Sequence, residues 1–105
     1  MHIQIVTFSL KDIDHDAYAK LCDELAPAYA AVPGLTSKTW LADRAANTYG
    51  GVYEWESADA LAAFTKTELF NAVVSHPNLA NLTSTDFAVL DAPTRVTRRF
   101  QSEMA

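Results

Sequence analysis

Cysteine is almost absent from this chain of 105 residues, in which Cys22 is the only one. A lone cysteine excludes an intramolecular disulfide. Residues 1–10 lack the basic segment and apolar run of a signal peptide. No apolar stretch approaches the ~20 residues that a membrane span needs. We therefore expect a cytoplasmic protein without a membrane partner.

Positive charge is scarce as well, with 8 Lys and Arg against 13 Asp and Glu and a net charge of −5. Binding of nucleic acid requires a concentrated basic face. The only positive cluster is formed by Arg95, Arg98 and Arg99, which we expect in a solvated tail or a dimer contact. The sequence therefore predicts no nucleic-acid partner.

Recognisable metal and cofactor motifs are also missing. His2, His15 and His76 are far apart, and no carboxylate or thiol accompanies them at ligand spacing. There is no G-x-S-x-G, P-loop or dinucleotide fingerprint, so hydrolase, kinase and Rossmann functions lack support. Cys22 lies on an apolar helical stripe and is interpreted as a buried, unreactive thiol. We expect neither a metal nor a cofactor.

What the sequence does contain is a regular alternation of strand and helix patterns. One domain is the only count that suits this length. Apolar residues at both odd and even positions indicate strands that are buried on two faces. Apolar residues three and four positions apart indicate helices. Ser57 and Thr67 are suited to begin helices. We expect strands near 2–10, 36–43, 48–56 and 82–90, helices near 14–32 and 57–75, a domain over 1–91 and a tail over 92–105.

The order β-α-β-β-α-β is that of the ferredoxin-like α+β fold, a four-stranded antiparallel sheet with its first and third strands in the centre. Two helices cover only one face of such a sheet. The other face is still apolar here, and a second copy of the chain is the most economical cover. The sequence therefore predicts a homodimer.

The second and third strands carry most of the aromatic residues. A four-residue loop would pair Asp43 with Thr48 and place Trp40 opposite Gly51, with Lys38 and Tyr53 on the same face. A five-residue loop would instead move Trp40 to the side of Val52. We favour the four-residue loop, and both registers remain open at this stage.

A glycine pair surrounded by large rings is consistent with a binding pocket. Glycine within a central strand costs stability, which close approach by a ligand or another backbone can offset. Core packing is the alternative explanation for each ring. The predicted pocket lies between sheet and helices, with Tyr49 and His76 nearest its mouth, and is lined by Trp40, Tyr53, Trp55, Phe64, Phe70 and Gly51.

Four segments resemble a known family in order and spacing: residues 26–35, 38–41, 49–55 and 68–70. The chain is similar there to proteins classed as YdhR-type monooxygenases, which belong to the dimeric α+β-barrel superfamily. The resemblance covers about residues 1–91. It implies a homodimer whose two sheets form a barrel with one pocket in each protomer, and it implies activity only loosely.

Two functions are consistent with these residues and with the resemblance. The first is a cofactor-independent monooxygenase that deprotonates a small aromatic substrate, a quinol or a polyketide-like phenol, and lets the anion react with dioxygen. His76 or Tyr49 would handle the proton, because the unperturbed pKa of histidine is ~6.5. The second is a non-catalytic binder of small apolar molecules that uses the same pocket. A purely structural dimer module is a weaker third interpretation.

Overall fold

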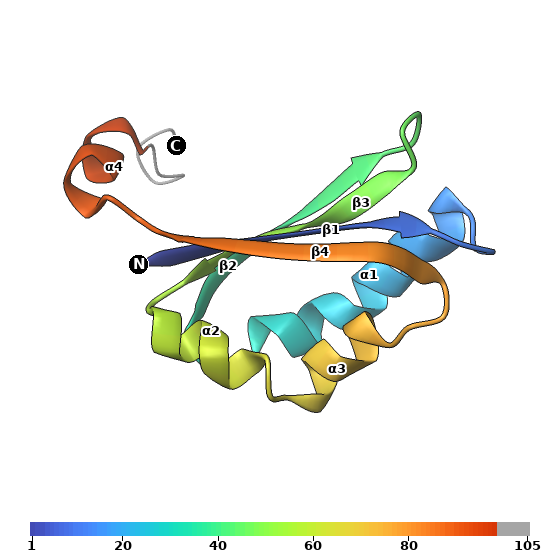
Figure 1. Cartoon of the computed structure of the whole chain (residues 1–105), viewed down its shortest axis with the longest axis horizontal. Coiled ribbons are helices and arrows are strands. Elements are labelled where there is room, and N and C mark those ends of the chain that lie inside the picture. Colours follow the sequence, from blue (N-terminus) through green and yellow to red (C-terminus); the bar gives the residue numbers. More distant parts are fainter. Residues whose placement is uncertain (99–105) are drawn as a thin grey trace.

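The computed structural model describes residues 1–98 of the chain. Figure 1 shows the elements in this part as β1 (His2–Leu10), α1 (His15–Ala30), β2 (Leu35–Asp43), β3 (Thr48–Trp55), α2 (Ala58–Phe64), α3 (Glu68–Val74), β4 (Leu79–Ala88) and α4 (Asp91–Thr97). The first seven follow the predicted order, with the second helical segment divided into α2 and α3. The ferredoxin-like α+β fold is therefore confirmed.

The four strands form one antiparallel sheet in the order β2-β3-β1-β4. As predicted, β1 and β3 occupy the centre. Helices α1, α2 and α3 lie together on one side of this sheet, and α4 lies on the other side near one end (Figure 1). The sheet therefore has one covered face and one face that is mostly free of helices.

The hairpin between β2 and β3 has the four-residue loop that the sequence favoured. Asp43 pairs with Thr48, and Trp40 lies opposite Gly51. Lys38 consequently pairs with Tyr53 on the face that the helices cover. The alternative register is excluded by this pairing.

Side-chain caps set the beginnings of the three helices on the covered face. Asp14 accepts a hydrogen bond from the backbone N–H of Ala17 at the start of α1, and Ser57 does the same for α2. Thr67 begins a new helix and so divides the predicted segment 57–75 into two. Pro27 lies within α1 without ending it, and the helix ends at Ala30, slightly before the predicted boundary.

The core lies between the covered face of the sheet and these helices, and it is rich in aromatic rings. One polar side chain is buried within it: Gln4 is 1% exposed. Its amide donates to the Ser84 hydroxyl at 3.0 Å and accepts the indole N–H of Trp55 at 3.2 Å. The buried hydrophobic residues are Val6, Phe8, Tyr18, Tyr29, Tyr49, Tyr53, Trp55, Leu61 and Phe64.

The last strand differs from its predicted bounds, since it begins at Leu79 and ends at Ala88. Asn81 adopts a left-handed backbone conformation, with φ of 57°. The pairing with β1 shifts there, so that two residues of β4 oppose Phe8. This bulge lets the pairing continue toward Leu79, whereas the apolar pattern alone begins at Leu82.

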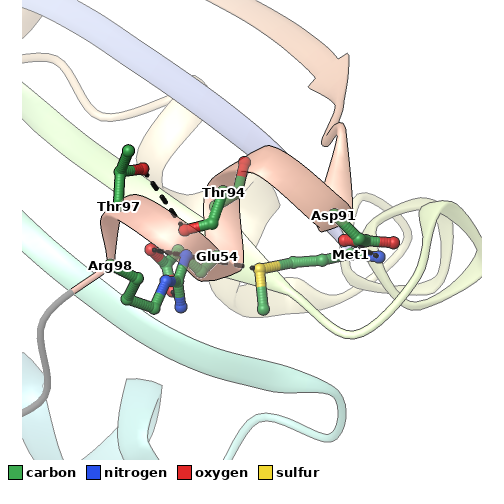
Figure 2. Close-up of polar contacts among 6 residues, drawn as sticks. All are labelled: Met1, Glu54, Asp91, Thr94, Thr97 and Arg98. Carbon is green, nitrogen blue, oxygen red and sulfur yellow. Dashed lines mark hydrogen bonds and ion pairs between the residues drawn. The ribbon is translucent and has the colours of Figure 1, made fainter.

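The predicted tail contains a helix, α4, which is fixed to the sheet by polar contacts. Figure 2 shows the guanidinium of Arg98 beside the carboxylate of Glu54 on β3. Arg98 donates to the two carboxylate oxygens at 3.1 and 3.2 Å. The N-terminal amine of Met1 lies 3.8 Å from Asp91. Arg95 is exposed on this helix. Arg99, the third residue of the predicted positive cluster, lies outside the described residues.

The helix-free face retains apolar side chains. Ile3 and Ile5 of β1 and Val52 of β3 are half-buried there, and Phe87 of β4, which pairs with Ile3, is 55% exposed. No helix in residues 1–98 is long and apolar enough to cross a membrane.

Candidate functional site

A cavity of about 140 Å³ lies between the covered face of the sheet and helices α1 and α3. Cavities of roughly 150 Å³ in protein cores admit a molecule the size of benzene. Its size therefore suits one six-membered ring. The lining residues are Phe8, Tyr18, Leu21, Cys22, Leu25, Tyr29, Lys38, Trp40, Gly50, Tyr53, Leu69, Ala72, Val73, His76 and Leu79.

Helix α1 contributes one wall through the apolar stripe recognised in its sequence. Tyr18, Cys22 and Tyr29 belong to this stripe, and all three face the cavity. Burial raises the pKa of both phenol groups and of the thiol. The two hydroxyls therefore remain protonated at neutral pH and can donate hydrogen bonds, whereas the thiol is a weak nucleophile.

Lys38 is the only Lys, Arg, Asp or Glu in the lining. Its Nζ lies 3.4 Å from the ring centroid of Trp40 and 3.5 Å from that of Tyr29. The ring of Tyr53 is at 4.8 Å. Among residues 1–98 the amine forms no ion pair. Three aromatic rings thus surround an amine that has no carboxylate to neutralise it.

Lys38 can reach the rings because Gly51 has no side chain in its path. A Cβ atom at position 51 would lie 2.9 Å from Cε of Lys38 and 3.3 Å from Cε1 of Tyr53. The lysine chain therefore runs across the space that the missing side chain leaves. Gly50 serves a different purpose, because a Cβ there would lie 1.8 Å from the backbone oxygen of Val6. One glycine accommodates the lysine, and the other allows two strands to approach.

Two effects act in opposite directions on the charge of Lys38. The rings attract the ammonium form, by about 2 kcal/mol or somewhat more when water is excluded. Burial without an ionic partner disfavours the same form by several kcal/mol. The burial effect is larger, and it lowers the pKa of Lys38 to about 7. A substantial fraction of the amine is therefore uncharged at neutral pH.

His76 follows α3 and lies in the cavity lining. Its Nδ1 accepts the backbone N–H of Asn78 at 3.1 Å. The neutral ring consequently carries its proton on Nε2 and can donate a hydrogen bond from that atom. To accept a proton, the ring would have to give up the bond to Asn78.

The other predicted site residues are divided between the lining and the core. Trp40 and Tyr53 line the cavity, as His76 does. Trp55 is fully buried, and its indole is bonded to Gln4. Phe64 and Phe70 pack edge to face at 5.4 Å outside the lining, and Gly51 lies under the lysine chain.

Tyr49 lies at the other end of the aromatic core. Its hydroxyl is bonded to Nδ1 of His15 at 2.9 Å, and its ring packs against Tyr18. The ring is 3% exposed and is not part of the cavity lining. Tyr49 and His76 are therefore not brought together at one mouth.

A family profile described as "Putative mono-oxygenase ydhR" matches residues 3–99. The chain belongs to this family. Membership supports a monooxygenase-like function. A comparison with curated proteins gives no match.

Solved structures with the same fold as this YdhR-family chain include an oxygenase, a haem degrader and a protein of unknown function. SnoaB of Streptomyces nogalater, a cofactor-independent oxygenase, is 18% identical with a TM-score of 0.65, over 85% of this chain and 93% of that one. MhuD of Mycobacterium tuberculosis, a haem degrader, is 19% identical with a TM-score of 0.66, over 86% and 96%. A protein of unknown function from Nitrosomonas europaea is 17% identical with a TM-score of 0.72, over 87% and 90%. At these identities the likeness shows the fold alone.

Lys38 of this YdhR-family chain was not among the predicted site residues, although the favoured register already placed it beside Trp40 and Tyr53. A charged residue on the covered face of a sheet was the available signal. Tyr18 and Tyr29 were harder to assign, because their spacing is equally typical of core packing. Their place in the lining depends on the position of α1 over the sheet.

Proposed function

We propose that this protein is a cofactor-independent monooxygenase that acts on a small dihydroxybenzene-type substrate. One observation carries the proposal: an amine with a lowered pKa, Lys38, stands in an apolar cavity walled by aromatic rings. A general base is most effective when its pKa is near the working pH. The uncharged form of Lys38 meets this requirement, and its surroundings suit a flat aromatic ring.

The first step is transfer of the phenolic proton to Nζ of Lys38. The product is a phenolate beside an ammonium group, and in an apolar cavity this pair is held more strongly than in water. The aromatic and aliphatic walls of the cavity hold the substrate ring beside this amine and exclude water. His76 donates from Nε2 to a substrate oxygen, so that it orients the ring while Lys38 takes the proton.

The oxygen step requires no reductant other than the substrate. The phenolate transfers electron density from a ring carbon to dioxygen, and a carbon–oxygen bond forms to give a peroxide. The peroxide takes up the proton held on Lys38. Its O–O bond then breaks with loss of the C–H proton, and water leaves. A dihydroxybenzene and O₂ thus give a hydroxyquinone and H₂O, with one oxygen atom in each product.

The size of the cavity favours a single ring over a polyketide. About 140 Å³ is close to the space that benzene fills. Of the two substrate types that the sequence suggested, the quinol is therefore the one we propose.

We also propose that the active form is a homodimer. The support is the helix-free face of the sheet, on which Ile3, Ile5, Val52 and Phe87 leave an apolar surface. A second copy would cover it.

The proposal is tested with 1,4-dihydroxybenzene under ¹⁸O₂, with a protein-free sample to correct for autoxidation. We expect one ¹⁸O atom in the hydroxyquinone and one in water. Lys38→Met should reduce the rate by about 10² to 10⁴. Lys66→Met, which alters an exposed lysine, should leave it unchanged. His76→Ala should have a smaller effect than Lys38→Met. A larger rate reduction by His76→Ala than by Lys38→Met would instead identify His76 as the proton acceptor.

The same samples separate the enzyme from a simple binding protein. If the dihydroxybenzene binds to the wild-type protein but oxygen uptake equals that of the protein-free sample, the protein is a binder and the monooxygenase proposal is wrong.

A further inference from the structure

Lys38 lines a second space in addition to the cavity. Outside the cavity is an open hollow of about 280 Å³ between α1 and β2. Tyr29, Lys38 and Trp40 line both the cavity and the hollow. Thr36 and Ser37 give the hollow a polar side. Lys38 is therefore shared by the cavity and the open hollow, and a small molecule in the hollow would lie against its side chain without crossing the core.

We propose that Lys38 is also a nucleophile, which takes a small aromatic aldehyde from the hollow and joins its carbonyl carbon in a reversible imine. This activity is independent of the proposed oxygenase reaction and needs no oxidant. It assigns to the cavity a second class of ligand, a carbonyl compound with one aromatic ring.

The reaction balances with the amine and the aldehyde alone. The nitrogen lone pair attacks the carbonyl carbon, and one N–H proton passes to the carbonyl oxygen to give a carbinolamine. The second N–H proton passes to the hydroxyl group, which leaves as water while the C=N bond forms. The hydroxyls of Tyr29 and Tyr53 remain protonated, because burial raises their pKa, and they can relay these protons.

The surroundings of Lys38 favour the uncharged amine that such an attack requires. An amine in an apolar pocket is activated by the loss of water around its charged form. The titratable groups that line the cavity from other elements are two phenols and a thiol on α1, a phenol on β3 and an imidazole after α3. None is a carboxylate that would hold the ammonium form. They are Tyr18, Tyr29, Cys22, Tyr53 and His76.

The walls determine which aldehydes are suitable. The cavity has room for one ring, and its sides are aromatic and aliphatic. An aromatic aldehyde can place its ring against the aromatic and aliphatic walls of the cavity while its carbonyl group faces Nζ of Lys38. A sugar aldehyde would have to leave its hydroxyl groups without partners in the same space.

Reductive trapping tests the inference directly. The wild-type protein is mixed with benzaldehyde and cyanoborohydride under nitrogen, and peptides are mapped by mass spectrometry. We expect Lys38 to be benzylated at least ten times faster than Lys11, Lys20 and Lys66, all of which are exposed. The labelling rate of Lys38 should rise with pH around 7, well below the range in which a lysine amine ordinarily loses its proton.

The N-terminal amine of Met1 is a built-in comparison. Free α-amino groups are in general less basic than lysine side chains and react with aldehydes without any cavity. Excess phenol should protect Lys38 but not Met1, because only the lysine stands beside the cavity. Lys38→Arg should keep a cation at this position and abolish the labelling there.

Labelling of Lys38 no faster than of Lys66, or equal loss of labelling at Lys38 and Met1 when phenol is added, would overturn the inference. The experiment excludes oxygen, so its failure leaves the monooxygenase proposal standing. Conversely, selective trapping without any oxygen uptake in the earlier test would retain the nucleophile and remove the oxygenase.

Discussion

Two diagonally placed residues on neighbouring strands create the unusual chemistry of this cavity. Lys38 extends along the covered face of β2, and Gly51 of β3 lacks the side chain that would block it. A lysine on an ordinary sheet face would bend toward solvent. Here the glycine and three rings hold it inside, and burial lowers its pKa to about 7.

Replacing Lys38 by Met should stabilise the protein at neutral pH. The folded pKa of about 7 is lower than the unfolded value of ~10.4. Between these values the unfolded chain binds a proton that the folded chain lacks, so wild-type stability falls as the pH decreases from ~10.4 to about 7. Below pH 7 the cost is fully present. Lys38→Met removes the cost of burying the amine. The free energy of unfolding should therefore increase by about 1 to 3 kcal/mol at pH 7, after allowance for solvent screening.

Urea unfolding at pH 7 and pH 10 measures this difference. The gain of the methionine variant over wild type should become smaller at the higher pH. Lys66→Met is the control, since its exposed lysine should give no such pH-dependent gain. An equal gain at both values of pH would show that better packing, not the amine charge, is the cause.

The two glycines should differ sharply in their tolerance of alanine. In Gly51→Ala the new methyl group meets the flexible end of Lys38, which can move aside, so we expect a cost of about 1 to 3 kcal/mol. In Gly50→Ala the new methyl group meets the backbone of β1, which cannot move aside. The φ angle of Gly50 is also +156°, which a residue with a side chain rarely adopts. We expect more than about 4 kcal/mol there.

Thermal unfolding compares the two alanine variants, and the benzaldehyde trap adds a second measurement. Gly51→Ala should reduce labelling of Lys38 while the protein stays folded. Equal destabilisation of both variants would contradict the different purposes assigned to these glycines.

At the level of elements, the sequence predicted what local pattern determines. The caps at Ser57 and Thr67, the four-residue loop and the central position of β1 follow from residue type and period. Helix α4 could not be found in this way, because Val96 is its one large apolar residue and it therefore has no apolar stripe. The cavity could likewise be predicted only in part. The strand register put Lys38 on the face of Trp40 and Tyr53, but it could not show which residues of α1 form the opposite wall.

The contact between Arg98 and Glu54 should hold α4 in place. Both oxygens of the carboxylate are engaged, at 3.1 and 3.2 Å, and both side chains are 23% exposed. A double-mutant cycle of Arg98→Ala and Glu54→Ala should give a coupling energy of about 1 kcal/mol. Arg95→Ala, on the same helix but exposed, should change stability by no more than about 0.5 kcal/mol. A coupling energy near zero would mean that α4 is held by something else.

At the level of the whole molecule, the two faces of the sheet have different roles. The covered face holds the cavity and the amine. The other face carries α4 near one end, and β1 and β3 present Ile3, Ile5 and Val52 on it. Apolar side chains on an open sheet face are typical of an interface, and the proposed homodimer assigns them one.

Phe87→Glu is the sharpest test of the proposed homodimer. Phe87 lies on β4 opposite Ile3 and is 55% exposed, so a charge there should be tolerated by the isolated protomer but not by an apolar interface. We expect the dimer to dissociate at micromolar concentration, with a dissociation constant raised at least a hundredfold, while circular dichroism remains unchanged. Val74→Glu is the matched control, because Val74 is similarly exposed, at 47%, on α3 of the opposite side. Light scattering that shows a wild-type monomer, or dissociation by Val74→Glu instead, would mean that the apolar sheet face is not where two chains meet.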